Sequence, residues 1–235
     1  MHLSPLGDRA LLIHLGTIID ESTRRLVRAA CTRLEARPVP GMIELVPAFT
    51  SVAVYYEPMH VPENSEAGTG GSPYARFAAL VTAALDQLAE ESVPAARTLD
   101  IPVCYGGDLG PDLDEVARVH DLAAEEVVRI HTSGDYLVYM LGFAPGFAYL
   151  GGLSPRIATP RRPQPRTMVP AGSVGIGGDQ TGAYPLASPG GWQIIGRTPL
   201  ILFDAARTPA ALLAAGDRVI FRAISPSEFR SASAG

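Results

Sequence analysis

From residue 134 onward the chain loses helical periodicity, and this loss constrains its fold more than any other feature. Short β-type runs alternate there with turns rich in glycine and proline. The runs are YLVYMLGF, SVGIGG, WQIIGRT, LILF and RVIFRAI. Many short strands separated by such turns are typical of an all-β sandwich or a small barrel. We therefore predict one of these two architectures for the C-terminal part of the chain.

The N-terminal part shows a different pattern, in which helical and strand-like segments alternate. Expected strands cover residues 9–16, 42–49 and 51–57, and expected helices cover residues 20–37 and 74–92. A strand-like run at 97–105 follows, and two short helices are expected within 106–133. The β-α-β-β-α order followed by a strand predicts a small ferredoxin-like domain built on a split βαβ unit. The run at 97–105 fits either part of the chain.

The change of pattern near residues 92–97 divides the chain into two domains. We predict an α+β protein with a small N-terminal α+β domain at 1–94 and an all-β domain, either a sandwich or a β-barrel, at 95–235. A chain of 235 residues is long enough for such a division and still buries a core of useful size.

The composition excludes several kinds of chemistry. All 19 basic residues are arginine, and the chain has no lysine. A P-loop lysine, a Schiff-base lysine and a biotinylated lysine are therefore excluded. A formal net charge of −5 gives no general support to nucleic-acid binding.

The sequence has the features of a soluble protein of a reducing compartment. Cys31 and Cys104 lie far apart and form neither a CxxC pair nor a disulfide framework. The first residues lack the pattern of a signal peptide, and no apolar run approaches the roughly 20 residues that span a bilayer. We therefore expect a cytoplasmic location.

Residues 154–167, the arginine loop, form the first candidate binding segment. The loop has no acidic residue and carries four arginines: Arg156, Arg161, Arg162 and Arg166. Its prolines stiffen it and remove backbone donors. Because guanidinium groups bind carboxylates and phosphates through paired hydrogen bonds, the loop predicts an anion site. The alternative is a solvated basic loop, or one whose arginines pair with acids elsewhere.

The second candidate segment is GFAPGFAYLGGL at residues 142–153. Phe143, Phe147 and Tyr149 are spaced for one face of a strand or loop, and glycines separate them. The segment could form the aromatic lip of a pocket with exposed backbone N–H groups. It could equally form a barrel corner, whose glycines allow tight turns and whose rings fill the core.

The third candidate segment is the glycine-rich stretch at residues 169–200. It matches neither a P-loop nor a dinucleotide fingerprint, but glycines before Gln180 could form a backbone nest for an anion. Gln193 and Arg197 follow on an expected strand at an even spacing, so they share one face. Within SPGGW, four residues are expected to form one wall of a pocket: Ser188, Gly190, Gly191 and Trp192. The alternative is a turn and a core strand, with the tryptophan as a plug.

Other reactive side chains give weaker signals. The five histidines match no metal-ligand spacing, so we predict no metal site. His120 and His131 border the short helices and are expected to be surface or capping residues. Ser173 in AGSVG lacks the spacing of a nucleophile elbow. Asp108 and Asp112 lie in a Gly/Pro turn, where a helix N-cap is favoured over a polar site.

Four sequence blocks together resemble a known family. They are CYGGDLGPDLDEVA, YMLGFAPGFAYLGGL, PRRPQPRTMVPAGSVGIGG and YPLASPGGWQIIGRTPL, and LGDRALLIHLG and ELVPAFTSVAVYYE extend the likeness to the front. The chain is identified on these blocks as a member of the carboxyltransferase-type family. That family includes the B subunit of 5-oxoprolinase, proteins labelled allophanate hydrolase subunit 1, and the kinase A inhibitor of sporulating bacteria.

The resemblance implies a cyclophilin-like β-barrel after the small N-terminal domain, and membership of an enzyme complex. A partner like the C subunit of 5-oxoprolinase, usually encoded next door, and a third protein like its A subunit would join this chain. The assembly would open 5-oxoproline to glutamate with ATP, and with Mg²⁺ at the level of the complex. Guanidinium and backbone N–H groups would then stabilise charge on the lactam oxygen.

The same resemblance suggests roles for individual residues. In this interpretation the catalytic residues are Arg162, Arg166, Gln180 and Arg197. The substrate-binding residues are Phe147, Ser188, Gly190, Gly191, Trp192 and Gln193.

Two other functions stay open on the sequence. Kinase-inhibitor members of the family bind a sensor histidine kinase and are regulators rather than catalysts. A component that processes the amides of allophanate or urea is the other alternative, although amidases with a Ser–cisSer–Lys arrangement are excluded by the absence of lysine.

Overall fold

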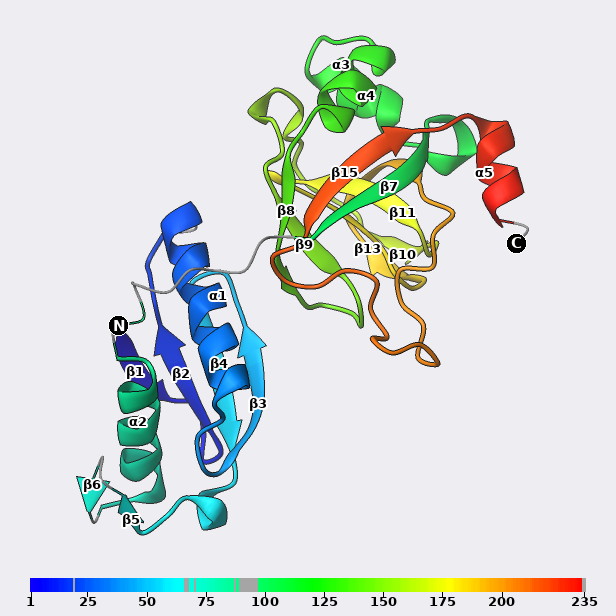
Figure 1. Ribbon diagram of the computed structural model, residues 1–235. Coiled ribbons are helices and arrows are strands. Elements are labelled where there is room, and N and C mark those ends of the chain that lie inside the picture. Colours follow the sequence, from blue (N-terminus) through cyan, green and yellow to red (C-terminus); the bar gives the residue numbers. More distant parts are fainter. Residues whose placement is uncertain (19, 66–67, 70, 87, 89–96, 234–235) are drawn as a thin grey trace. The chain divides into compact units, whose positions relative to one another are not determined.

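The computed structural model describes residues 1–18, 20–65, 68–69, 71–86, 88 and 97–233. The chain folds into two compact units, the N-terminal unit Met1–Ala95 and the barrel unit Ala96–Gly235 (Figure 1). Cys31 and Cys104 lie in different units, and both are free thiols. None of the helices in the described residues is long and apolar enough to cross a membrane.

The N-terminal unit is an antiparallel four-stranded sheet packed against two helices. Its strands lie in the order β1-β2-β4-β3. Their bounds, with those of the helices, are β1 His2–Pro5, β2 Ala10–His14, α1 Glu21–Ala36, β3 Met42–Pro47, β4 Ser51–Tyr56 and α2 Pro73–Ala84. A 3-10 turn at Pro58–His60 and the short pair β5 Asn64–Ser65 and β6 Gly68–Thr69 precede α2.

Local side-chain chemistry sets the starts of both helices. The Asp20 carboxylate accepts a hydrogen bond from the Thr23 backbone N–H at 2.7 Å, and the Ser72 hydroxyl accepts one from Ala75 N–H at 3.2 Å. These caps satisfy N–H groups that have no partner within the helix. The helices then bury apolar side chains against the sheet, and Phe77 of α2 stacks on Tyr56 of β4 with ring centroids 4.2 Å apart.

The ferredoxin-like arrangement predicted for this unit is not confirmed. The strand-like run at 97–105 is β7 (Thr98–Tyr105), and it lies in the barrel. The fourth strand of the N-terminal sheet is β1 instead. The physical reason is that Ile101 and Val103 of β7 are fully buried in the barrel core. The predicted helix at 74–92 ends at Ala84, and residues 87 and 89–92 lie outside the described residues.

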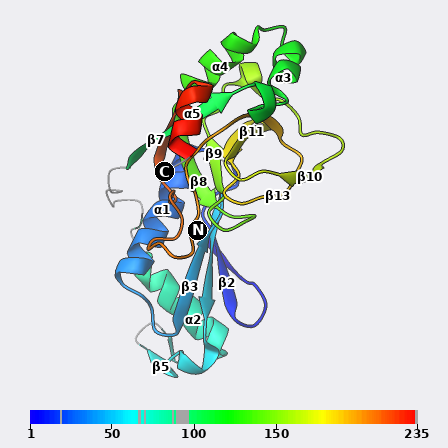
Figure 2. The ribbon, with the colours of Figure 1, turned by 90° about the vertical axis from the view of Figure 1, so that its right-hand side faces the viewer.

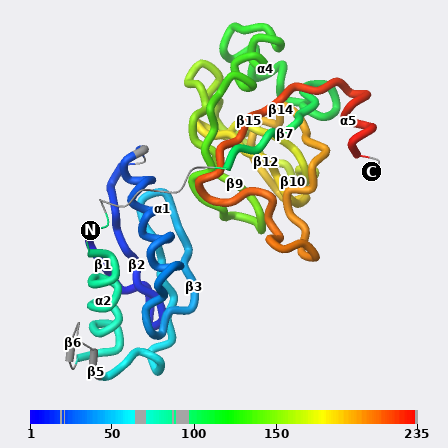
Figure 3. The backbone as a smooth tube through the Cα atoms, in the orientation of Figure 1, coloured from blue at the N-terminus to red at the C-terminus, as the bar shows by residue number. Residues whose placement is uncertain are grey.

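The barrel unit is a closed barrel of seven strands, which confirms the small barrel expected from the sequence. The strand order is β11-β12-β9-β8-β15-β7-β14. Figure 3 shows β7 and β15 running side by side, and their pairing is parallel. The remaining bounds are β8 Tyr136–Leu141, β9 Ala148–Gly151, β11 Ser173–Gly177, β12 Gln180–Ala183, β14 Gln193–Arg197 and β15 Arg218–Ala223.

Helices and one small sheet surround the barrel. The two short helices expected within 106–133 are α3 (Leu113–Val119) and α4 (Ala124–Thr132), which lie together at one end of the barrel (Figures 1 and 2). A two-stranded sheet, β10 (Arg166–Val169) with β13 (Ser188–Gly190), flanks the barrel. Helix α5 (Pro226–Ser233) follows β15. The run LILF forms no strand, since only an isolated bridge joins Phe203 to Ala211.

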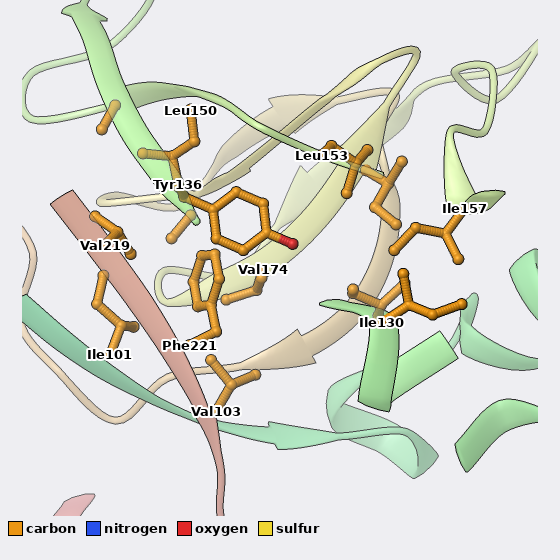
Figure 4. Close-up of a cluster of buried hydrophobic side chains, with 14 of the residues drawn as sticks. Ile101, Val103, Ile130, Tyr136, Leu150, Leu153, Ile157, Val174, Val219 and Phe221 are labelled. Carbon is orange, nitrogen blue, oxygen red and sulfur yellow. The ribbon is translucent and has the colours of Figure 1, made fainter. Parts of the chain in front are cut away.

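The barrel core combines aliphatic side chains with a buried histidine, His131. Figure 4 shows the Tyr136 and Phe221 rings against each other among aliphatic side chains. His131 is fully buried there, so its predicted surface or capping role is wrong. Its Nε2 lies 2.9 Å from the Thr181 hydroxyl, and its Nδ1 lies 2.8 Å from the Tyr105 hydroxyl. Thr181 itself donates to a backbone carbonyl, so Nε2 carries the proton and Tyr105 donates to Nδ1.

We predict that His131 makes the fold sensitive to acid. Burial lowers the pKa of His131 from 6.5 to about 3. Below about pH 6.5 the unfolded chain therefore binds a proton at His131, whereas the folded chain does not. As the pH falls from 6.5 towards 3, the free energy of unfolding decreases by about 1.4 kcal/mol per pH unit. Urea unfolding of the natural protein at pH 7 and pH 5 should show this loss, and His131→Gln should show a smaller one. Equal losses in the two proteins would contradict the prediction.

Candidate functional site

An aromatic cavity of about 230 Å³ opens on the barrel unit. The loop between β8 and β9, the arginine loop, the end of β12 and the β13–β14 segment all contribute to it. Its lining consists of Phe143, Phe147, Tyr149, Arg161, Pro165, Tyr184, Pro189, Gly190, Gly191 and Trp192. No acidic residue stands among these, so the walls are apolar except for one guanidinium, phenol groups and backbone amides.

The loop between β8 and β9 forms one side of the cavity through two tight turns. The Ala144 N–H donates to the Gly142 carbonyl at 2.8 Å around Phe143, whose φ of 67° lies in the left-handed region. A bulky residue adopts such a γ-turn only under local strain. Pro145 and Gly146 (φ 77°) then occupy the central positions of a second turn closed by Phe147 N–H to Ala144 O. The result is an exposed Phe143 ring at the cavity mouth and a buried Phe147 ring in its floor.

Phe147 is the centre of an aromatic cluster. Four other rings surround it edge to face at centroid distances between 5.0 and 5.5 Å. They are Phe143, Tyr149, Tyr184 and Trp192. Edge-to-face pairs add stabilisation beyond the area that they bury. The cluster also contains Val169 and Ile194 and is separate from the main barrel core. The aromatic segment was predicted to form either a pocket lip or a barrel corner with rings in the core. It does both, because these rings fill a small core and also form the wall of a pocket.

Two glycines let the rings approach the backbone. A Cβ on Gly182 would lie 3.2 Å from Trp192 and 2.9 Å from the Ala148 carbonyl oxygen. A Cβ on Gly190 would overlap the hydroxyl of the buried Tyr184. At Gly191, by contrast, the nearest atoms would be 3.7 Å away, which is ordinary contact. Gly182 and Gly190 are thus required by packing, whereas Gly191 tolerates a methyl group.

A buried carboxylate, Asp112, holds the arginine loop beside the cavity. Asp112 is 3% exposed and accepts four hydrogen bonds. Arg166 binds both its oxygens at 2.8 Å, Arg162 binds Oδ1 at 2.9 Å, and the Ile194 backbone N–H binds Oδ2 at 2.6 Å. Asp112 occupies the N-cap position of α3, but its side chain makes no capping bond. The favoured capping role is therefore wrong, because the arginines and Ile194 use all the carboxylate's acceptor capacity.

The arginine loop divides into paired and unpaired groups. Arg162 and Arg166 pair with Asp112, and Arg156 lies 3.3 Å from Glu126. The prediction of an anion site is thus wrong for these three arginines. The alternative, in which the arginines of the loop pair with acids elsewhere in the chain, applies to them. Arg161 differs, since its guanidinium lies 5.9 Å from the centroid of the Trp192 ring and lines the cavity. Within the described part of the chain, no acidic partner of Arg161 is found.

Hydrogen bonds also fix the backbone on both sides of Arg161. The Gln193 side-chain amide donates to the Pro160 carbonyl at 3.0 Å, and the Arg162 N–H donates to the Gly191 carbonyl at 2.7 Å. The Tyr184 phenol lies nearby, and burial raises its pKa while the Trp192 backbone N–H and the Arg161 charge oppose that rise. Arg161 and Tyr184, which directly follows β12, thus both line the cavity.

The structure brings some of the predicted site residues to the cavity and places others elsewhere. Phe147, Gly190, Gly191 and Trp192 line it, and Ser188 precedes the lining segment on β13. Gln193, Arg162 and Arg166 do not line the cavity, but their hydrogen bonds hold the arginine loop beside it. Gln180, at the start of β12, is outside the lining, as is Arg197, which donates to the Ala171 carbonyl at 2.7 Å.

Phe143 and Tyr149 were predicted as part of an aromatic lip and Arg161 as part of an anion site, and all three line the cavity. No binding role was predicted for Pro165, Tyr184 or Pro189, which line it too. All lie within the three candidate segments, so their neighbours were the available signal. Which arginine of the loop would remain free depended on a partner about 50 positions away, Asp112, and no local pattern reveals that choice.

Among the residues that the structure describes, no group of three or more His, Cys, Asp or Glu side chains could hold a metal ion.

We predict that Asp112→Asn destabilises the barrel unit. Removing the charge leaves two guanidinium groups without a counter-ion, and breaking a buried pair costs about 3 kcal/mol. Thermal unfolding should show a clear fall in Tm for Asp112→Asn. The control is Asp114→Asn, which changes an exposed carboxylate on the first turn of α3 and should cost less than about 1 kcal/mol. Similar effects of the two substitutions would contradict the proposed role of Asp112.

A second prediction concerns the two adjacent glycines of the cavity. Gly190→Ala should move the Tyr184 ring and distort the pocket, whereas Gly191→Ala should leave it intact. The fluorescence of Trp192, the single tryptophan of the chain, reports on this cavity. Its emission maximum should shift in Gly190→Ala and stay near the natural value in Gly191→Ala. The opposite order would refute the packing argument.

Comparison with known proteins shows what the chain is related to. The family model for the carboxyltransferase domain, subdomain C and D, matches residues 1–213. A protein from Bacillus subtilis (strain 168), named as the B subunit of 5-oxoprolinase, is 49% identical over 229 residues, covering 97% of this chain and 95% of that protein. A protein of the same name from Escherichia coli O157:H7 is 40% identical over 222 residues, covering 92% and 93%.

A solved structure gives the same relationship in three dimensions. The crystal structure of the protein TTHA0988 superposes with a TM-score of 0.77 at 34% identity and covers 92% of this chain. This chain spans only 40% of the length of TTHA0988. Sequence and structure agree over almost all of the chain, and the chain therefore belongs to the family of the carboxyltransferase domain, subdomain C and D, together with the proteins named as the B subunit of 5-oxoprolinase.

Proposed function

We propose that this protein is the B subunit of an ATP-dependent 5-oxoprolinase, which opens 5-oxoproline to glutamate together with partner subunits. The observation that carries the proposal is the sequence similarity to two proteins of that name, which extends over nearly the full length of the chain at 49% and 40% identity. The aromatic cavity supports it, because its size and lining suit a small ring rather than a polymer. This reaction makes the complex a hydrolase of a cyclic amide.

Within the cavity, the predicted substrate-binding residues take specific roles in this proposal. Phe147 and Trp192 would together form the apolar wall against which the ring of the substrate packs, and the backbone at Gly190 and Gly191 would face its polar edge. Amide N–H groups aimed at a carbonyl oxygen stabilise the negative charge that develops when an amide is attacked or phosphorylated.

The predicted catalytic residues take a supporting role or none in this site. Arg162 and Arg166 act as positioning residues through Asp112, because their guanidinium groups are already engaged. Gln180 and Arg197 have no place in the site.

The cavity does not fit ATP with Mg²⁺. A volume of about 230 Å³ lies below the range of about 300–1,000 Å³ typical of ligand pockets, and a nucleoside triphosphate is larger than most ligands. The lining offers no carboxylate for the cation. We therefore assign nucleotide binding to the assembled complex and not to this cavity.

Partner subunits supply the groups that this chain lacks. We infer two partners, one like the C subunit and one like the A subunit of 5-oxoprolinase, in agreement with the name of the relatives. TTHA0988 supports a fused or paired arrangement, because a unit like this chain occupies less than half of it. Such a complex would work in the cytoplasm, where ATP is available.

The proposal predicts an activity that needs several chains at once. Co-expression with the C-like and A-like proteins should yield a complex that releases glutamate and phosphate from 5-oxoproline and ATP. Leaving out this chain should abolish the release, and adding it back should restore it. Glutamate release without this chain would refute the proposal. A stable complex that processes only allophanate or another amide would favour the amide-processing alternative, and capture of a histidine kinase in place of these partners would favour the regulatory one.

A further inference from the structure

We propose that the aromatic cavity is a recognition site for a small cyclic carboxylate and that Arg161 is its specificity-determining residue. This inference rests on the proposed function, because it assigns the substrate's carboxylate to a residue of this chain. The sequence places Arg161 in the predicted anion-binding loop, but no catalytic or substrate-binding role was predicted for it. Its case is made by charge, by position and by the chemistry of the walls.

The first argument is the distribution of charge around the cavity. Two guanidinium groups, Arg162 and Arg166, share the single carboxylate of Asp112, so that cluster has one positive charge in excess. Arg161 adds another positive charge at the cavity itself, and the lining contains no acid. An occupant with a negative charge would neutralise Arg161, whereas a neutral or cationic one would not.

The second argument is that Arg161 is held in position before any ligand arrives. The carbonyl on its N-terminal side is bound by Gln193, and the N–H on its C-terminal side is bound by the Gly191 carbonyl. Beyond it, Asp112 anchors Arg162 and Arg166. The guanidinium rests near the Trp192 ring, which favours a cation over its face. Such pre-organisation lowers the entropic cost of binding.

The third argument concerns the class of anion. Five aromatic rings contribute to the cavity wall, and apolar walls favour a ligand whose charge is confined to one end. A carboxylate matches the planar fork of arginine and carries a single charge. A phosphate presents the same acceptor chemistry but carries more charge to desolvate, and here one guanidinium would have to balance it. A five- or six-membered ring bearing one carboxylate, such as 5-oxoproline, fits these requirements best.

The test is isothermal titration calorimetry of the full chain, alone and in the co-expressed complex. The probes are 5-oxoproline, 2-pyrrolidinone, which lacks the carboxylate, and inorganic phosphate. We expect 5-oxoproline to bind at least about tenfold more tightly than either of the other two probes. Arg161→Gln should weaken its binding by at least about tenfold, and Arg161→Lys should restore part of it, since lysine keeps the charge but loses the fork.

The matched control is Arg118→Gln, which removes the same charge from an exposed arginine paired with Glu115 on α3. It should bind 5-oxoproline like the natural protein. Unchanged binding by Arg161→Gln, equal binding of 2-pyrrolidinone, or equal binding of phosphate would overturn the proposal, as would the absence of 5-oxoproline binding in both the chain and the complex.

The complex assay separates this inference from the proposed function. Glutamate release with an unchanged KM for 5-oxoproline in Arg161→Gln would overturn the role of Arg161 and leave the proposed function standing. Arg161-dependent binding of 5-oxoproline without glutamate release in any assembly would support the site and reject the oxoprolinase function.

Discussion

The barrel unit's site depends on one buried carboxylate. Asp112 binds two arginines of the loop and the backbone of β14, so three segments distant in sequence meet at a single charge. Charge-assisted hydrogen bonds in a dry environment are strong, and removing either side leaves an uncompensated charge. The arginine loop has no helix beyond the 3-10 turn at Pro155–Ile157 and, before β10, no strand of its own beyond an isolated bridge at Thr159. Asp112 therefore provides the order that secondary structure does not.

The aromatic cluster uses the order that Asp112 imposes. Its rings come from the β8–β9 loop, β9, the end of β12 and the start of β14, and Phe147 lies at their centre. Gly182 and Gly190 have no side chain, which lets the rings lie against the backbone at these positions. A strained Phe143 then remains exposed at the mouth. Strain and exposed aromatic surface of this kind concentrate where a protein binds something.

The two features together explain why a chain without lysine, and without a nucleophile triad in its sequence, can still contribute to an enzyme. The cavity supplies shape, apolar walls and one oriented cation, which are functions of recognition and positioning. Under the proposed function, nucleophiles, nucleotide and metal come from partners in a shared site. Binding energy that holds a substrate in the right place is itself a large part of catalysis.

The sequence by itself determined an all-β sandwich or barrel, two short helices and the three segments that surround the cavity, because periodicity and turn residues act locally. It also determined which chemistry is absent. The assignment of the run at 97–105 needed the tertiary structure, since strand pairing decides which core receives Ile101 and Val103. The burial of His131 also became clear only from the tertiary structure. Above all, the choice of Arg161 as the cation of the cavity required knowing that Asp112 takes Arg162 and Arg166. Four identical side chains in one loop differ only in their long-range partners, and folding alone decides those.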